Sequence, residues 1–195
     1  MTIFGGLYSG SLSLNDAWVL NYANGLGGIS SWTQLTTTGG PPLARQLHTA
    51  VYDTANNSMT VFGGRSNGGG ILNDVWVLSN ANGLGGSPTW TQLTTTGNAP
   101  VARYGHSAIY DVTNNLMTIF GGQISGGFLN DVWVLSNANG LGGTPSWTQL
   151  TTTGSAPTTR QAHTAVYDNA PGPGTARRRA RRYGRRTSRS GRWER

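Results

Sequence analysis

One hexapeptide recurs three times at a constant spacing, and this recurrence constrains the fold more than any other feature of the chain. Residues Met1–Gly6 read MTIFGG, Met59–Gly64 read MTVFGG, and Met117–Gly122 read MTIFGG again, so each copy starts 58 residues after the one before. The flanking residues repeat as well. A repeat of this length indicates an array of one supersecondary unit, as found in propellers and solenoids.

Each unit contains four short apolar runs, which predict four β-strands. The runs are rich in Val, Ile, Thr, Tyr and Trp and are bounded by Gly, Asn, Asp or Pro, which is the pattern typical of strands joined by turns. In the order of the unit, the first run follows an arginine (Arg45, Arg103 and Arg160), and the second run ends in Gly-Gly. The third run begins at Leu14, Leu72 and Leu129, and the fourth begins at Trp32, Trp90 and Trp147.

Apolar side chains occupy both faces of several predicted strands. The run Val75-Trp76-Val77-Leu78 has no polar residue in alternation. A sheet that is buried on both faces shows this pattern. Sheets stacked face to face around an axis meet this requirement, whereas a single four-stranded sheet leaves one apolar face in water.

The motifs resemble those of the kelch-repeat family of β-propellers. The resemblance depends on the Gly-Gly pair, the following Leu-Asn-Asp-[Val/Ala]-Trp strand, the second tryptophan and the Arg-x-x-His segment, and it covers residues 1–168. It implies an all-β, partial kelch-type propeller of about three four-stranded blades. The two tryptophans of a unit are 14 residues apart, farther than in the usual kelch pair, because an Asn/Gly-rich loop separates their strands.

The repeat predicts the organisation of the chain. We expect a partial blade at residues 1–41, blades at 42–99 and 100–156, and the first strand of a further blade at 157–168, which includes a lone strand His163–Tyr167. Because the array starts at a second strand and stops after a first strand, its open blade edges predict self-association.

Residues 169–195 differ from the array, because they hold ten of the fourteen arginines and almost nothing apolar. The net charge of +7 therefore describes this tail, while residues 1–168 carry four arginines against six aspartates. We expect the tail to be disordered. Two interpretations stay open: a nucleic-acid-binding or localisation tail, or an out-of-frame fragment junction, since the change falls in the middle of a repeat.

Several classes of protein are excluded. The chain has no cysteine, so it forms no disulfide and has no thiolate or Cys-zinc chemistry. No apolar run is long enough to span a membrane, and no signal peptide is visible. The style of the repeats indicates a bacterial protein, with an extracytoplasmic location as a guess.

Most recurring residues have structural explanations. We expect Gly-Gly to serve backbone packing, the tryptophans to form the core between blades, and His48, His106 and His163 to be hydrogen-bonded without a metal. Asp16, Asp74 and Asp131 recur too evenly to form a catalytic pair, and we expect them to accept hydrogen bonds in turns.

The sequence predicts a non-catalytic interaction scaffold without a cofactor or metal, which binds a protein or glycan through loops at one mouth of the propeller. Loops that vary on a constant frame are where binding usually occurs. An oxidase fragment is the alternative, although kelch oxidases use a Tyr–Cys cross-link that this chain cannot form. The candidate partner-binding residues are Arg45, Arg103, Arg160, Arg65 and Gln123. For the first three a structural role is the alternative, in which each arginine bonds carbonyl groups of a neighbouring blade.

Overall fold

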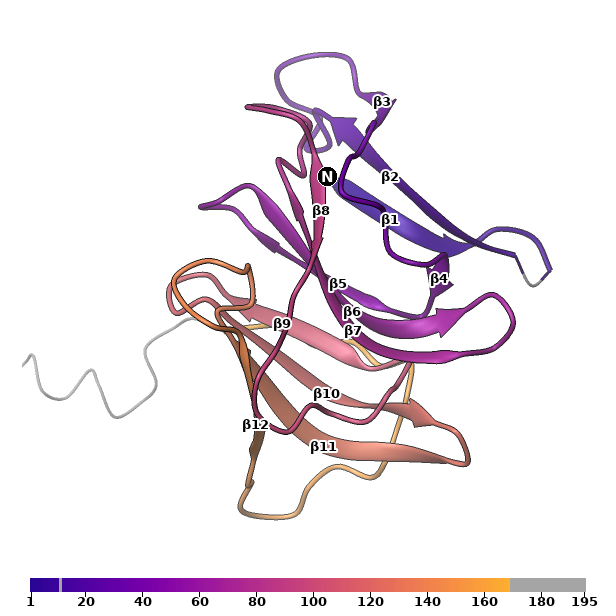
Figure 1. Cartoon of the computed structure of the whole chain (residues 1–195), viewed down its shortest axis with the longest axis vertical. Helices are drawn as coiled ribbons and strands as arrows, with labels where there is room; N and C mark the ends of the chain where they lie inside the picture. The colour runs from indigo at the N-terminus through magenta and orange to yellow at the C-terminus, as the bar shows by residue number, and fades with distance from the viewer. Residues whose placement is uncertain (11, 169–195) are drawn as a thin grey trace, which may run out of the picture.

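The computed structural model of the chain describes residues 1–10 and 12–168, and these residues form three antiparallel β-sheets without a helix. In Figure 1 the sheets follow one another from the N-terminal sheet at the top to the third sheet at the bottom. This arrangement confirms the all-β, kelch-type propeller architecture. Residues 169–195, the predicted tail, lie outside the described residues.

Each sheet is built from consecutive strands of one repeat. The first sheet has the order β1-β2-β3, the third has the order β9-β10-β11-β12, and in the second the first two strands, β4 and β5, both pair with β6. Their bounds are β1 Thr2–Leu7, β2 Ser13–Asn21, β3 Ser31–Gln34, β4 Arg45–Gln46, β5 Thr49–Asp53, β6 Ser58–Ser66, β7 Ile71–Ser79, β8 Thr89–Gln92, β9 Ser107–Asp111, β10 Leu116–Ile124, β11 Gly127–Ser136 and β12 Ser146–Leu150.

The Gly-Gly pair produces a β-bulge at the same place in every sheet. The register between β6 and β7 shifts between Phe62 and Gly64, and equivalent shifts occur in the other two sheets. Gly63 adopts a φ of 64°, in the left-handed region, and a Cβ there would lie 2.8 Å from the carbonyl oxygen of Arg103. Glycine is therefore required both by the backbone conformation and by close contact with the next blade.

The core lies between neighbouring blades. The Trp90 ring packs 4.7 Å from that of Phe4, and the Trp147 ring packs 5.0 Å from that of Phe62, in each case across a blade boundary. Trp90 is 2% exposed, whereas Trp32, on the outer strand of the first sheet, is 50% exposed. The expected role of the tryptophans is thus confirmed for Trp90 and Trp147 and not for Trp32.

The predicted strand His163–Tyr167 differs from its earlier copies. Residues 163–167 form no strand with other described residues, because none of these supplies the second strand of that blade. They are nevertheless held against β9, where His163 Nε2 lies 2.9 Å from Ser107 Oγ and the Tyr167 hydroxyl donates to Asp111 Oδ2 at 2.9 Å.

Candidate functional site

The loops between the second and third strands lie at one end of all three sheets. Figure 1 shows the β1–β2, β6–β7 and β10–β11 hairpins on the same side, at the right of the view. The first two are joined, because the Asn67 side chain accepts a hydrogen bond from the Ser13 amide and donates one to the Ser13 carbonyl. We call this end of the molecule the loop face.

Arg45 is buried within the second blade. Its guanidinium is 0% exposed and forms a two-pronged ion pair with Asp74 at 2.7 and 2.8 Å. The same group donates to the carbonyl oxygens of Gly63 and Leu43. Although burial raises the pKa of Asp74, the hydrogen bonds and charge of Arg45 hold that pKa below its ordinary value.

Arg103 repeats this arrangement in the third blade. It pairs with Asp131 at 2.6 and 2.9 Å and donates to the carbonyls of Gly121 and Val101. Asp131 also accepts from the Trp133 indole at 2.6 Å, as Asp74 does from Trp76 at 2.7 Å. Asp74 and Asp131 therefore each anchor an arginine and a tryptophan. The expectation that these aspartates accept hydrogen bonds in turns was wrong, because they lie within the strands β7 and β11 and accept from side chains.

Arg45 and Arg103 thus have the structural role that is the alternative to partner binding, although the carbonyl groups that they bond belong to their own blade and not to a neighbouring one. Arg45 and Arg103 turn their guanidinium groups into the fold, because a carboxylate and a backbone carbonyl of the same blade satisfy them there. The side chains of these two arginines present no exposed donor to a partner. Only Arg160 of the three is exposed, with hydrogen bonds to Thr158.

Arg65 lies exposed on the loop face and interacts with the next blade. Its guanidinium carbon is 5.9 Å from the centre of the Tyr104 ring, within the range of a cation–π contact. Tyr104 is fixed by two backbone hydrogen bonds with Gln123, at 3.1 and 2.8 Å. The structure thus brings the candidates Arg65 and Gln123 together through Tyr104, and no carboxylate pairs with Arg65 among residues 1–10 and 12–168.

A polar hollow of about 320 Å³ adjoins Arg65. It lies where β4 pairs with the end of β6, so Gln46 is directly opposite Arg65 in the register. Its wall is Gly10, Gln46, Arg65, Ser66, Gly68 and Gly69. Gln46 and Tyr104 were not singled out by sequence reasoning, although each stands next to an Arg of the Arg-x-x-His segment, a position that faces the loop end.

The histidines link neighbouring blades through hydrogen bonds. His106 Nε2 lies 2.7 Å from Thr49 Oγ1 of the preceding blade, as His163 lies near Ser107. Burial, followed by the charge of Arg103 and the other histidines, lowers the pKa of His106 to about 3. Burial and the charge of Arg45 lower the pKa of His48 to about 4. The lowered pKa values make these histidines neutral at pH 7, and the expected side-chain hydrogen bond is present for His106 and His163.

The described part of the chain contains no group of three or more His, Cys, Asp or Glu side chains with the spacing of a metal site. Its titratable groups recur at equivalent positions in successive blades instead of gathering in one place. Nor do residues 1–10 and 12–168 include a helix long and apolar enough to cross a membrane.

Comparison with known families decides the class of this fold. A family profile described as "KLHDC2/KLHL20/DRC7 Kelch-repeats domain" matches residues 1–171. The chain belongs to the kelch-repeat family. The arginine–aspartate pairs, Gly-Gly bulges and inter-blade tryptophans described above are thus features of kelch blades in this chain.

Curated relatives share this kelch array over much of the chain. Tip elongation aberrant protein 1 of Schizosaccharomyces pombe is 30% identical over 167 residues, covering 84% of this chain and 13% of its own length. Host cell factor 2 of Homo sapiens is 34% identical over 134 residues, which cover 63% of this chain and 16% of the relative's length. Kelch repeat-containing protein 2 of Saccharomyces cerevisiae is 30% identical over 175 residues, which cover 86% of this chain and 19% of the relative's length. This kelch chain thus spans less than a fifth of each relative, and because all three are eukaryotic, the expected bacterial origin is not supported.

Among solved structures, that of YjhT has the same kelch fold. It aligns with a TM-score of 0.62 at 16% identity, over 86% of this chain and 53% of the YjhT chain. At this identity the likeness concerns the fold alone.

Proposed function

We propose that this kelch array is a non-catalytic protein-interaction module that binds its partner on the loop face, with Arg65 at the centre of the contact. One observation carries the proposal: Arg65 holds an exposed guanidinium over Tyr104, beside a polar hollow and without a carboxylate partner in the described chain. A guanidinium positioned in this way offers a planar pair of donors to an aspartate or glutamate of a partner.

The frame around Arg65 is rigid, which favours binding. The backbone of Arg65 is paired with Gln46 on one side and Ile71 on the other, and Tyr104 is locked to Gln123. A side chain that is already oriented loses little conformational entropy when it meets a ligand. The loops around it differ in sequence between blades, which gives each position of the loop face its own chemistry.

A protein partner is favoured over a glycan, because every recurring indole that would stack on a sugar ring is used elsewhere, except that of the half-exposed Trp32. Trp90 and Trp147 are buried between blades, and Trp76 and Trp133 donate their indole N–H groups to aspartates. Exposed large side chains in the hairpins of the loop face, Tyr8, Leu12 and Phe128, provide apolar contact area.

Selection of random peptides on the immobilised protein tests this function. We expect the selected peptides to be enriched in Asp and Glu, and Arg65→Glu to weaken their binding about tenfold to a hundredfold, the range of a charge-assisted hydrogen-bonded pair. Arg65→Lys keeps the charge but loses the planar fork, so its loss should be intermediate.

The matched control is Leu84→Ala. Leu84 is 67% exposed in the β7–β8 loop, which lies at the opposite end of β7 from Arg65. Peptides that show no acidic bias, no enrichment at all, or equal sensitivity to the Leu84 and Arg65 substitutions would each contradict the proposed function.

A further inference from the structure

The β6–β7 hairpin carries a set of residues suited to an anion that the two equivalent hairpins lack. Residues 65–70 read RSNGGG, whereas the segments at the same place in the other blades, residues 7–10 and 123–126, read LYSG and QISG. Each segment directly follows the Gly-Gly pair of its blade, so the positions are equivalent. Of these three hairpins, the second alone combines a positive charge with a run of three glycines.

We propose that the polar hollow beside Arg65 binds a phosphate monoester, in the form of a phosphorylated serine or threonine of the protein partner. This inference rests on the proposed function, because it names the acidic group that the loop face selects. A phosphorylated side chain carries about 1.5 to 2 negative charges at pH 7 and three terminal oxygens that accept hydrogen bonds. The hollow of about 320 Å³ matches both properties, because its wall provides a positive charge, several donors and no carboxylate.

The Arg65 guanidinium is held at the wall of the hollow. It lies over the Tyr104 ring, 5.9 Å from its centre, and beside Gly69, where a Cβ would be 3.3 Å from Arg65 Nη2. Gly69 also has a φ of 89°, in the left-handed region, so a larger residue there would be strained as well as close to the guanidinium. The glycine therefore leaves the guanidinium room at the wall, where its planar fork matches a phosphate.

Further donors of the hollow lack a strong partner within the described chain. The Gln46 side chain and the Gly68 amide form no hydrogen bond with any of residues 1–10 and 12–168. The Ser66 hydroxyl donates to the Gly70 carbonyl over 3.2 Å, and rotation about its C–O bond frees it for a ligand. These donors come from two elements, β4 and the β6–β7 hairpin. A carboxylate holds its two oxygens in one plane, whereas the three oxygens of a phosphate project in different directions and meet donors from both elements.

The hollow is formed before a ligand arrives. The Asn67 side chain accepts from the Ser13 amide at 2.6 Å and donates to the Ser13 carbonyl at 3.1 Å, which joins the β6–β7 and β1–β2 hairpins. The turn is closed by the Ser66 amide, which donates to the Gly70 carbonyl at 2.8 Å, and by the Gly69 amide, which donates to the Ser66 carbonyl at 3.0 Å. Binding in such a frame costs little conformational entropy.

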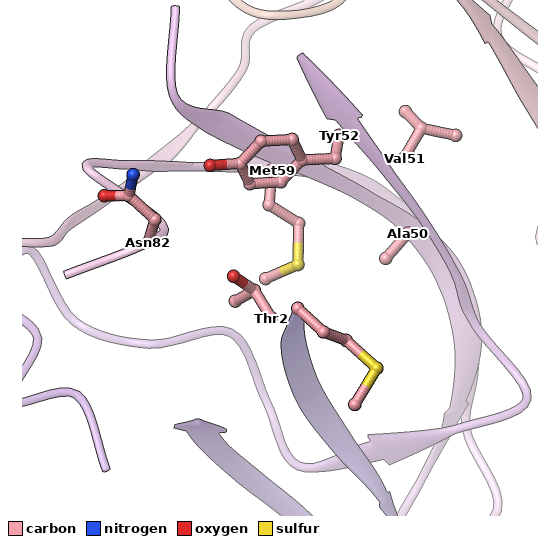
Figure 2. A pocket seen from close by; sticks show the side chains of 7 residues that line it. Thr2, Ala50, Val51, Tyr52, Met59 and Asn82 are labelled. Carbon is pink, nitrogen blue, oxygen red and sulfur yellow. The ribbon is translucent and has the colours of Figure 1, made fainter. Parts of the chain in front are cut away.

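A second hollow, of about 400 Å³, does not suit an anion. Figure 2 shows its lining side chains, which are mostly apolar and none of which carries a positive charge: Met1, Thr2, Ala50, Val51, Tyr52, Met59 and Asn82. A phosphate placed there would lose hydration without gaining a side-chain counter-charge, which is unfavourable. The charge of Arg65 therefore distinguishes the hollow on the loop face as the place for a phosphate.

Peptides that differ at one position test this ligand. A library with a central phosphoserine between random residues is selected on the immobilised full chain, and the enriched sequence is then synthesised with phosphoserine, glutamate or serine at the centre. We expect the affinity to fall in that order, with about tenfold or more between the phosphoserine and glutamate forms, because a dianion with three oxygens forms more charge-assisted hydrogen bonds. Inorganic phosphate, which lacks the peptide, should compete only at concentrations at least a hundredfold higher.

Substitutions in the wall locate the binding. Arg65→Lys should lower the affinity for the phosphoserine form about tenfold, because the planar fork is lost. Ser66→Ala and Gln46→Leu should each lower it about threefold to tenfold, and they should affect the glutamate form less, since it uses fewer donors. Ser125→Ala, a serine-to-alanine change in the β10–β11 hairpin, is the matched control and should leave both affinities unchanged.

The outcomes separate this inference from the proposed function. If Arg65→Glu weakens acidic peptides but the phosphoserine form binds no more tightly than the glutamate form, the phosphate ligand is wrong while Arg65 remains the binding residue. Inorganic phosphate that competes as well as the peptide, or Ser66→Ala and Gln46→Leu that both behave as Ser125→Ala does, would overturn the inference too. If neither the acidic nor the phosphorylated peptides depend on Arg65, the proposed function fails with it.

Discussion

At the scale of the residue, the arginine of the Arg-x-x-His segment acts as a buried anchor in two blades. Arg45 and Arg103 are 0% exposed, and each joins a loop carbonyl, a Gly-Gly carbonyl and an aspartate. A buried charge is stable only when it is paired and fully hydrogen-bonded. The aspartate also orients a tryptophan, so the pair fixes the start of the first strand against the third strand of its own blade.

Breaking one of these pairs should strongly destabilise the fold. We expect Asp131→Asn to lower the free energy of unfolding by about 3–5 kcal/mol, because Arg103 would be left buried without a counter-charge. Arg103→Met with Asp131→Leu removes both charges and should recover a large part of this loss.

Urea unfolding of the single and double variants measures the difference. Arg65→Ala is the control, because this exposed arginine should change stability by no more than about 0.5 kcal/mol. If Asp131→Asn were as stable as the Arg65→Ala control, the anchoring role of the pair would be wrong.

At the scale of the element, the Gly-Gly bulge sets how closely one blade approaches the next. The Gly64 amide donates to the Arg103 carbonyl at 2.9 Å, and a Cβ on Gly63 would lie 2.8 Å from that same oxygen. The bulge therefore gives the second strand its bend and also forms a hydrogen bond between blades. This is the reason the two glycines recur while the residues around the hairpin loops vary.

Gly63→Ala should therefore lower the stability of the fold by more than backbone strain alone would. Gly63 and Gly68 both have positive φ values, 64° and 85°, but a Cβ on Gly68 would meet no atom within 4 Å. We expect Gly68→Ala to lose about 1 kcal/mol from backbone strain and Gly63→Ala to lose clearly more, because the contact with Arg103 must open. Thermal unfolding of the two variants gives this comparison, and equal losses would show that the close approach between blades is unimportant.

At the scale of the whole molecule, the histidines make the stability of the array depend on pH. His48, His106 and His163 all have pKa values lowered from 6.5, chiefly by burial, and the values for His48 and His106 fall to about 4 and 3. The unfolded chain binds protons on these side chains below about pH 6.5, whereas the folded chain does not. Their contribution to stability is therefore complete above pH 6.5 and is lost as pH falls toward 4.

We expect the free energy of unfolding to decrease between pH 6.5 and 4.5 by on the order of 1 kcal/mol per pH unit for each buried histidine. Four aspartates have pKa values below their ordinary range, and they add their own loss only below about pH 4: Asp53, Asp74, Asp111 and Asp131. His106→Gln keeps a polar contact toward Thr49. Because one fewer proton is bound on unfolding, the free energy of unfolding of this variant should decrease less steeply with falling pH. A variant with the same pH dependence as the wild type would contradict this assignment.

The repeat by itself determined the architecture. Copies of Met-Thr-[Ile/Val]-Phe-Gly-Gly, Leu-Asn-Asp-x-Trp and Arg-x-x-His at a constant period define four strands per unit, and apolar residues on both strand faces require stacked sheets. These properties depend on local conformation and on burial, which periodic sequence patterns record directly. For this reason the all-β class, the Gly-Gly packing and the structural histidines could be predicted.

Only the tertiary structure decided what each copy of a recurring residue does. The sequence treats Arg45, Arg103 and Arg160 alike, yet two are buried against aspartates and the third is exposed, because an equivalent carboxylate lies within reach of only the first two among the described residues. Likewise, Gln46 and Tyr104 gain their place beside Arg65 from strand pairing across blades. Which side chains meet depends on the packing between repeats, and a motif that is the same in every copy does not encode it.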